Sequence, residues 1–370
     1  MDFSLSEEAQ ATRDLAKQIL GDLMTPERHR ELEKAGEHLD PKAWSAIADA
    51  GLLGIAVPEA HGGAGLGFLE VAMVLEEVGR TTAKVPYLAT VVLGALPIAE
   101  FGSAEQQAEW LPRIASGDAI VTTALVEPRR EPSNPATAAS KAGDGWTLQG
   151  VKDFVIAGLD AALVLVPAVT DEGVGVFLVD PKGAGVTVER VDNSIGIPEA
   201  RITFDGAAAL GVLGSVGQGA EITDWITLRA SAGLASIASG VCDAALRITA
   251  EYTKTREQFG RPIATFQAVS QRAGDAYIDT EAVRLTALQA AWRISAGLPA
   301  EDKVAIAKFW AADGGDRVVR AAQHLHGGMG VDRDYPVHRY YVWAKWLELT
   351  LGGATSQLLK YGKSLADQKV

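Results

Sequence analysis

One stretch of the chain combines residue types that could contact a ligand: residues 252–263, which read YTKTREQFGRPI. A helix carrying basic side chains is expected to end near Phe259 and Gly260, where glycine can take the left-handed cap, and Pro262 blocks its continuation. This places Arg256 beside an exposed helix end. The arginine is then either a solvated side chain favoured by the helix dipole or a ligand contact, and the residues alone favour the first alternative.

Two glycine-rich segments could suggest phosphate binding, residues 61–67 (HGGAGLG) and residues 326–330 (HGGMG). A nicotinamide-type Rossmann site needs such a segment between a strand and a helix of one βαβ unit. Neither segment has that context, so the sequence argues against this kind of site.

Composition excludes several classes of protein. The single cysteine, Cys242, rules out an intramolecular disulfide framework, and with six scattered histidines it forms no cluster at zinc-ligand spacing. The formal net charge of −13 argues against a protein that coats nucleic acid or an anionic membrane. Because there is no long apolar run and the first residues are acidic, we expect a cytoplasmic protein. The absence of a ligand cluster predicts that it is metal-free, and the length of 370 residues predicts two or three domains.

Hydrophobic periodicity divides the chain into three predicted domains: an N-terminal helical domain (1–117), a middle β-domain (118–212) and a C-terminal helical bundle (213–370). In the first, Ser4 and Glu7 predict a capping box. A later one-face run is expected to end at Gly79; it comprises Val71, Val74, Leu75 and Val78.

The middle segment alternates β-branched runs with turn residues, which predicts a small antiparallel barrel or sandwich. The expected strands are 120–126, 146–151, 163–166, 174–179, 186–191 and 201–204. Helical periodicity then returns, with two apolar faces. One comprises Leu234, Ile237, Val241, Ala245, Ile248 and Tyr252; the other comprises Ile278, Leu285, Leu288 and Trp292.

The sequence resembles the acyl-CoA dehydrogenase family. The matching motifs are residues 58–65 (PEAHGGAG), residues 256–263 (REQFGRPI) with Phe266 and Gln267, and residues 326–330 (HGGMG) followed by 335–337 (YPV). They occur in the family's order and span nearly the whole chain. The resemblance implies an N-terminal helical domain, a middle antiparallel β-barrel or sandwich and a C-terminal four-helix bundle, in agreement with the periodicity.

The resemblance also implies FAD as cofactor and the oxidation of acyl-CoA thioesters to the trans-2-enoyl form. Arg256 would meet the pyrophosphate of an FAD bound mainly by a neighbouring subunit, a task that suits its two-pronged guanidinium. The residues expected around it are Gln258, Phe259, Ile263, Phe266 and Gln267. Gly327 and Gly328 would approach the adenosine end of the same FAD, where the lack of side chains permits close contact. His324 stands where the family usually has glutamine.

The chain lacks the family's catalytic glutamate at both positions where it can stand. The base must remove a proton alpha to the thioester. Leu228 occupies the first position, and the second falls in residues 349–357 (LTLGGATSQ), around Gly353, where there is no acid. The nearest acids in sequence are Glu221, Asp224 and Glu348, each of which we interpret as a surface carboxylate.

The middle domain also departs from the family. It keeps Val126-Glu127-Pro128 but continues as RREPSNP (129–135), where the family has a Gly-Ser-Asp loop beside the flavin. A strand that should read Trp-x-Thr reads DFVI (153–156). We therefore expect this chain's own flavin pocket to be degraded or filled.

The half of the cofactor machinery that reaches across an interface is thus retained, and the other half is lost. This resembles the glutamate-lacking subunit of actinobacterial α2β2 acyl-CoA dehydrogenases, to which residues 351–355 and 338–341 are also similar. The resemblance implies a half-site subunit with no catalytic residue of its own, paired with a homologue that carries the glutamate and binds most of a bulky acyl-CoA, such as a steroid thioester. Two alternatives stay open: a self-sufficient homotetramer with a displaced base at Glu221 or Glu348, and a non-enzymatic scaffold subunit.

Overall fold

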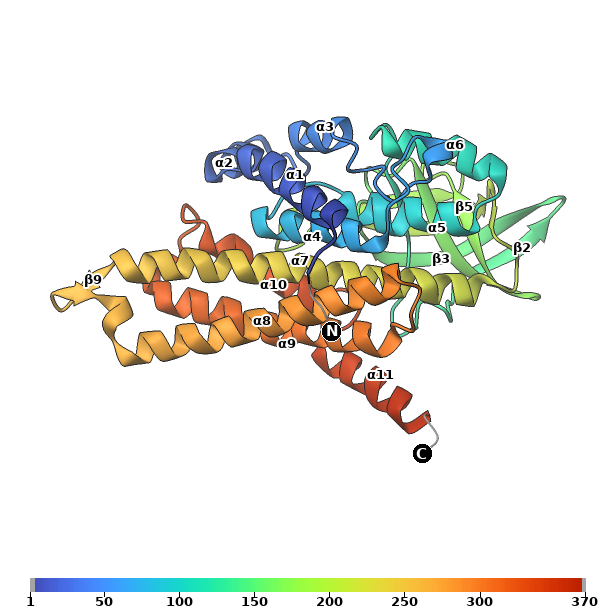
Figure 1. Ribbon diagram of the computed structural model, residues 1–370. Helices are drawn as coiled ribbons and strands as arrows, with labels where there is room; N and C mark the ends of the chain where they lie inside the picture. The colour runs from blue at the N-terminus through green and yellow to red at the C-terminus, as the bar shows by residue number, and fades with distance from the viewer. Residues whose placement is uncertain (1–3, 368–370) are drawn as a thin grey trace. The chain divides into compact units, whose positions relative to one another are not determined.

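The computed structural model of the chain describes residues 4–367 and begins with a series of helices (Figure 1). Their bounds are α1 Glu7–Leu23, α2 Pro26–Ala35, α3 Pro41–Asp49, η1 Glu59–His61, α4 Phe68–Thr81, η2 Leu88–Ala95, α5 Leu96–Phe101 and α6 Ala104–Ala115. The predicted capping box at Ser4 is wrong. The N-cap is Ser6, whose hydroxyl accepts the Ala9 amide at 3.1 Å, because helix α1 begins one residue after it.

Helix α4 confirms the predicted apolar face but corrects its end. The helix continues two residues beyond Gly79, to Thr81, and Thr82 takes the left-handed conformation (φ 48°) that closes it. Gly79 serves packing instead, since a Cβ built there would overlap the carbonyl oxygen of Ile237 on α7 (Gly219–Thr255). The glycine therefore marks a close helix crossing.

The middle part forms one eight-stranded sheet within the described range. Its strands are β1 Val121–Thr123, β2 Ala138–Ala142, β3 Gly145–Val155, β4 Leu163–Thr170, β5 Gly173–Val179, β6 Val186–Val191, β7 Glu199–Ala208 and β8 Gly211–Leu213. The order is β6-β7-β3-β2-β4-β5-β8, and β1 pairs with β4. Most pairings are antiparallel as predicted, but β1–β4 and β2–β4 are parallel, so the sheet is mixed. Phe177 and Phe204 are fully buried in its core.

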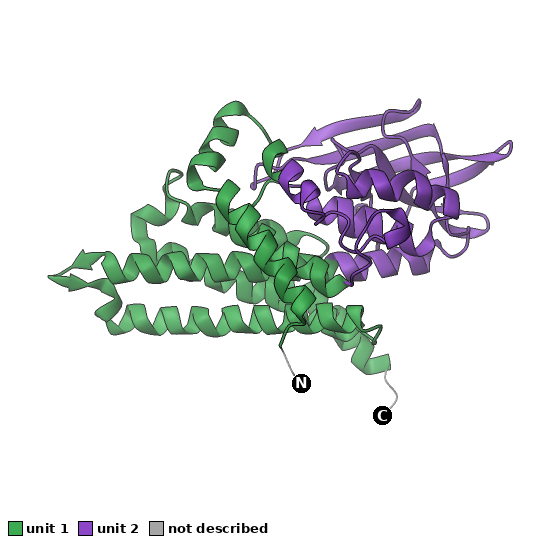
Figure 2. Cartoon of the chain, turned by 45° about the horizontal axis from the view of Figure 1, so that its top comes forward, with its two compact units in different colours: residues 1–43, 68–84, 231–370 green, residues 44–67, 85–230 purple. Residues whose placement is uncertain are grey.

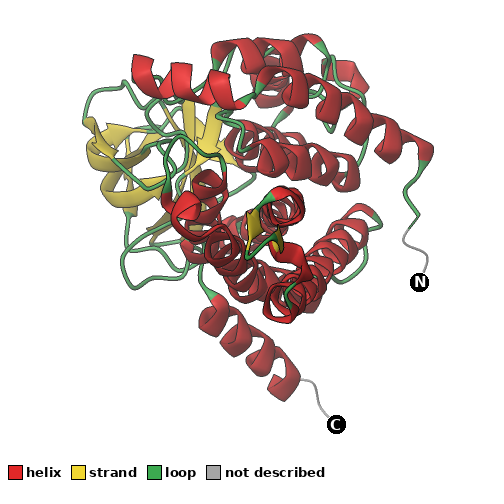
Figure 3. Ribbon diagram, turned by 90° about the vertical axis from the view of Figure 1, so that its left-hand side faces the viewer, coloured by secondary structure: helices red, strands yellow, loops and turns green. Residues whose placement is uncertain are grey.

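The chain returns to helices after β8, and these complete the predicted fold class. The elements after α7 are two short strands and a series of helices: β9 Glu257–Gln258, β10 Arg261–Pro262, η3 Ile263–Thr265, α8 Gln267–Ser295, α9 Glu301–His326, η4 Gly327–Val331, α10 Val337–Leu349 and α11 Ala354–Asp367. The short β9–β10 hairpin links α7 to α8 at one end of the bundle (Figure 1), and Figure 3 shows it as a small strand pair among helix ends. A search of the described residues for a membrane-spanning helix finds no candidate.

The predicted face of α7 is confirmed, but the apolar face predicted on α8 is not the buried side of that helix in the chain. Ile278 is 65% exposed and Trp292 is 40% exposed, whereas small side chains form the buried side of α8. That side comprises Ala276, Thr280, Val283, Ala287, Ala290, Ala291 and Ile294. Small residues let α8 lie close to α9, where a Cβ on Gly314 would come within 3.3 Å of Val283. On α8 the side that allows close helix packing is buried, and the side with the larger apolar residues is not.

The chain forms two compact units, and each collects segments that are distant in sequence (Figure 2). Unit 1 comprises residues 1–43, 68–84 and 231–370; unit 2 comprises residues 44–67 and 85–230. The hairpin and the second glycine-rich segment both lie in unit 1, and the sheet lies in unit 2. The boundaries predicted at 117 and 212 stay a prediction.

Candidate functional site

The hairpin after α7 presents Arg256 at the end of the helix. Helix α7 ends at Thr255, and β9 pairs with β10 through Gln258 and Arg261. Phe259 (φ 54°) and Gly260 (φ 74°) form the two-residue turn, in which both positions need positive φ. This corrects the predicted helix cap: Gly260 is left-handed as expected, but in a hairpin turn.

The Arg256 backbone is bonded on both sides, while its side chain is open. Its amide donates to the Tyr252 carbonyl at 2.8 Å, and its carbonyl accepts the Ile263 amide at 2.8 Å. Within residues 4–367 the exposed guanidinium makes no hydrogen bond or ion pair. An exposed, unpartnered guanidinium on a braced backbone suits an anionic ligand.

Two aromatic rings lie at the hairpin, one in its turn and one just after it. Phe259 is 92% exposed and meets Phe266 edge-on at 6.1 Å between ring centroids. The Arg261 guanidinium lies 4.3 Å from the Phe266 ring centroid. Gln258 and Gln267 are exposed and Ile263 is half-buried. The structure thus brings the predicted residues together over the hairpin, η3 and the start of α8.

The second glycine-rich segment forms an open turn at the end of α9. Gly327 has φ 59° and ψ −132°, and a Cβ built on Gly327 or Gly328 would meet nothing within 4 Å. Gly330 differs, because a Cβ there would crowd the Gln323 carbonyl. Gly327 and Gly328 therefore leave room for a ligand, and the nearby His324 is exposed. Of the first glycine-rich segment, Gly63 packs against the Val57 and Gly54 carbonyls, which is a structural role.

The hairpin and the glycine turn meet through two rings. His326, the last residue of α9, stacks on Tyr252, in the last turn of α7, with centroids 4.4 Å apart. Arg256 is one helical turn beyond Tyr252, and Gly327 directly follows His326. The two predicted FAD-contacting segments are therefore neighbours. The sequence motifs contain both ring residues, but they do not predict that the two rings pair, because only the tertiary fold brings them together.

Leu228, at the first position for a base, is a half-buried residue of α7. The next residue, Arg229, lies 3.4 Å from the Trp225 ring centroid, and burial lowers the pKa of its guanidinium to about 10. Trp225 in turn meets Phe101 edge-on at 5.1 Å. This region of unit 2 offers a cation and apolar rings but no proton acceptor at Leu228.

The second position for a base is a turn stabilised by hydrogen bonds from a buried lysine. Lys308, fully buried, donates to the carbonyls of Leu347, Glu348 and Gly352 at 2.9, 3.3 and 3.0 Å. Burial lowers the pKa of its ammonium to about 7. Leu351 has φ 56°, a conformation that costs a non-glycine residue energy. The turn is well defined, yet it carries no carboxylate.

The three acids nearest in sequence do not replace the base. Glu221 and Asp224 are exposed on α7, and Glu348 accepts a hydrogen bond from the Lys345 ammonium at 2.8 Å. A general base must reach the substrate's proton within hydrogen-bond distance. Two solvated carboxylates and one ion-paired carboxylate provide no support for a displaced base.

The loop at the expected flavin position is held in a strained conformation. Glu127 and Lys152 form a buried ion pair at 2.7 Å, and the Glu127 carboxylate also accepts the amides of Ala136 and Thr137 at 2.5 and 3.1 Å. Arg129 (φ 59°) and Phe154 (φ 52°) both have positive φ, and Phe154 is 54% exposed. The charged, proline-containing loop that the sequence predicts is therefore tightly anchored.

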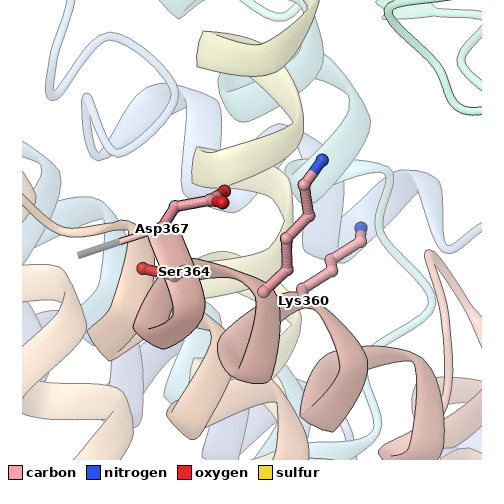
Figure 4. Close-up of a pocket in the computed structure, with 4 residues that line it drawn as sticks. Lys360, Ser364 and Asp367 are labelled. Atoms are coloured by element: carbon pink, nitrogen blue, oxygen red, sulfur yellow. The ribbon is translucent and has the colours of Figure 1, made fainter. Parts of the chain in front are cut away.

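No group of three or more potential metal ligands lies together among the described residues. A shallow pocket of about 500 Å³ lies along α11, lined by Lys360, Lys363, Ser364 and Asp367 (Figure 4). The Ser364 hydroxyl donates to the Asp302 carboxylate at 2.6 Å. None of the residues predicted to contact FAD lines this pocket.

The N-terminal helices, the sheet and the C-terminal helical bundle define an acyl-CoA dehydrogenase fold. Family profiles for the N-terminal, middle and C-terminal domains of acyl-CoA dehydrogenases match residues 6–118, 126–206 and 217–365. The chain belongs to the acyl-CoA dehydrogenase family, whose cofactor is FAD.

Similar proteins include members of this family from Mycobacterium tuberculosis. Acyl-CoA dehydrogenase FadE27 of Mycobacterium tuberculosis (strain ATCC 25618 / H37Rv) is 42% identical, over 99% of each chain. A chain in the crystal structure of the ChsE4-ChsE5 complex from Mycobacterium tuberculosis is 42% identical, with a TM-score of 0.95 over 100% of both chains. A chain of a variant of the Tcur3481-Tcur3483 steroid ACAD is 41% identical, with a TM-score of 0.91 over 98% of this chain and 99% of that one.

Proposed function

We propose that this chain is a noncatalytic half-site subunit of a heterotetrameric, FAD-dependent acyl-CoA dehydrogenase. One observation carries the proposal: the ring stack of Tyr252 on His326 joins the helix end that bears the exposed, unpartnered Arg256 to the open Gly327–Gly328 turn. Leu228 and Gly353, in contrast, leave both base positions without an acid. The chain keeps the means to bind a cofactor but not the means to remove a proton. A partner chain then has to supply the glutamate.

The residues present fit one part of FAD. Arg256 offers donors to a pyrophosphate, and Gly327 and Gly328 leave the space that an adenosine needs. The anchored loop with Arg129 and the exposed Phe154 leave no comparable support for the flavin ring in this chain. When bound, FAD supplies the hydride acceptor for α,β-desaturation of an acyl-CoA thioester. The role of this chain is to bind and orient that cofactor for its partner.

Similarity to the relatives supports a proposal for the partner and the substrate class. The similar solved structures are a complex of ChsE4 with ChsE5 and a steroid ACAD of Tcur3481 with Tcur3483. We infer a homologous partner that carries the catalytic glutamate in an α2β2 assembly. We also infer a bulky acyl-CoA substrate, such as a steroid thioester, bound mainly by the partner. These two inferences rest on similarity alone.

Arg256→Ala tests the proposal in the complex co-expressed with its partner. A charge-assisted bidentate contact contributes about 1.5–3 kcal/mol, so we expect FAD to bind about 10- to 100-fold more weakly. The measurement is a titration of the deflavinated complex with FAD, followed by flavin absorbance. Because Arg256 is exposed, the melting temperature of the FAD-free complex should not change.

Lys254→Ala is the matched control, since it removes the same charge from the same helix end. Its ammonium pairs with Glu251 at 2.8 Å, so we expect nearly unchanged FAD affinity. Equal effects of the two variants would show a diffuse charge effect and contradict a specific Arg256 contact. Unchanged affinity in Arg256→Ala would contradict the shared-site proposal itself.

A further inference from the structure

Three aromatic side chains from separate elements form a cluster between the two segments of the candidate FAD site. Tyr252 is on α7, His326 ends α9, and Tyr335 lies in the segment before α10. Besides the stack of His326 on Tyr252, the His326 and Tyr335 centroids are 5.2 Å apart, and those of Tyr252 and Tyr335 are 6.2 Å apart. The cluster thus joins the end of α7 to the segment that follows α9, which is more than 70 residues further along the chain.

The imidazole of His326 is held in one orientation. Its Nδ1 lies 2.8 Å from the Ala322 carbonyl, to which only a protonated Nδ1 can donate. The residue is 3% exposed, and burial lowers its pKa, which favours the neutral ring. Its buried Nε2 has no hydrogen-bond partner within the described residues. The main contacts of the ring are therefore the Ala322 bond and the two tyrosine rings.

The stack of His326 on Tyr252 lies where it can set the distance between the turn after α9 and the end of α7. The turn after His326 has positive φ at Gly327 and is exposed, so the α9 ladder alone does not determine where Gly328 lies relative to Arg256. The Tyr252 hydroxyl also reaches the His326 carbonyl, at a long 3.4 Å. Ring contact, and to a smaller extent this bond, connects the end of α9 to the last turn of α7.

We propose that His326 is a positioning residue that, through its stack on Tyr252, holds the Gly327–Gly328 turn at the distance from Arg256 that one FAD requires. The inference rests on the proposed function, because it takes these two segments as the cofactor contacts. His326 itself touches no ligand in this account. It acts by keeping the two contacts preorganised, so that FAD does not have to order them on binding.

The test is a double-mutant cycle on FAD affinity in the co-expressed complex, with the variants His326→Leu, Tyr252→Leu and the double variant. An aromatic pair is worth enough to change an affinity about two- to tenfold, so each single variant should weaken FAD binding by about that factor. The double variant should bind FAD no more weakly than either single variant, because the stack is already lost. His326→Phe, which keeps a ring on Tyr252, should recover most of the affinity.

Tyr340→Leu is the control for general loss of packing. Its hydroxyl donates to the Arg80 carbonyl at 3.1 Å in the same unit, so this variant should lower the melting temperature of the complex and leave FAD affinity unchanged. If His326→Leu behaves like Tyr340→Leu, the positioning role is wrong. If His326→Leu does not fold, the half-buried Tyr252→Leu decides alone, and unchanged FAD affinity in it overturns the inference.

Arg256→Ala, measured in the same titration, separates the two proposals. If it weakens FAD binding while the ring variants do not, the shared site stands and only the role of His326 fails. If Arg256→Ala has no effect, the shared site fails, whatever the ring variants do. Additive effects of His326→Leu and Tyr252→Leu would also contradict positioning through the stack.

Discussion

The burial of His29 makes the stability of the folded chain depend on pH. Its Nε2 donates to the Thr81 carbonyl at 3.0 Å, its Nδ1 is buried without a hydrogen-bond partner among the described residues, and Lys84 and Arg339 are nearby cations. Burial is the main cause that lowers the pKa of its imidazole to about 4, from an ordinary value of 6.5. The neutral ring is thus part of the folded state.

We predict that the chain loses stability between pH 6.5 and pH 4. In this range the unfolded chain takes up a proton at His29 that the folded chain does not. The free energy of unfolding therefore decreases as the pH is lowered from 6.5 to 4, by at most about 3 kcal/mol. Above pH 6.5 this residue contributes no pH dependence. His29→Gln, whose amide can still donate to Thr81, should flatten the dependence in urea unfolding at pH 7 and pH 5. Equal losses in both proteins would exclude His29 as the cause.

The family resemblance indicated the residues of the candidate site, which residue types alone did not, but it did not give the geometry of the site. Gly260 was expected to be left-handed and is, yet glycine adopts that conformation in helix caps and in hairpin turns alike, so the sequence could not separate the two. The open space at Gly327 and Gly328 agrees with the expected close approach of a ligand. The stack of His326 on Tyr252 could not be predicted, because it joins residues 74 positions apart through the tertiary fold.

Among the elements, helices with a clear apolar stripe were predictable, and short or small-residue elements were not. Strand β2 reads AASKA, which lacks the β-branched residues that indicate a strand, and it forms because β3 and β4 flank it. Helix α8 buries its small side instead of its larger apolar residues. The formation of β2 and the buried side of α8 both depend on the elements packed beside them, and hydrophobic periodicity does not contain that information.

Gly79 gives a sharp prediction for the contact between α4 and α7. A methyl group at this position would overlap the Ile237 carbonyl, and the two backbones would have to move apart. We expect Gly79→Ala to destabilise unit 1 by about 2–4 kcal/mol, at the upper end of overpacking effects. Urea unfolding of the isolated chain measures this change.

Gly274→Ala is the control, since it makes the same change inside α8, where a Cβ meets nothing within 4 Å. Alanine favours a helix over glycine by about 1 kcal/mol, so this variant should be neutral or slightly stabilised. A stable Gly79→Ala chain would show that Gly79 is not required for the crossing. The sequence-based interpretation of Gly79 as a helix terminator predicts a much smaller loss.

At the scale of the whole molecule, the distribution of functional groups supports the proposed half-site subunit. Unit 1 presents the arginine and glycine segments, and neither unit carries an acid at a base position. An isolated chain of this kind should not oxidise an acyl-CoA. In the proposed α2β2 assembly only the partner's sites are complete, so two FAD molecules should serve four chains.

We therefore predict about 0.5 FAD per polypeptide in the co-purified complex, and loss of flavin absorbance on addition of a steroid acyl-CoA only when the partner is present. Flavin absorbance against total protein gives the ratio, and anaerobic titration with the thioester gives the reduction. A self-sufficient homotetramer would instead bind about one FAD per chain and bleach it alone, using a base that the structure does not show at Leu228 or Gly353. A scaffold subunit without a cofactor role would leave the FAD affinity of the complex unchanged in Arg256→Ala. The three architectures thus differ in two measurable quantities, the flavin ratio and its dependence on Arg256.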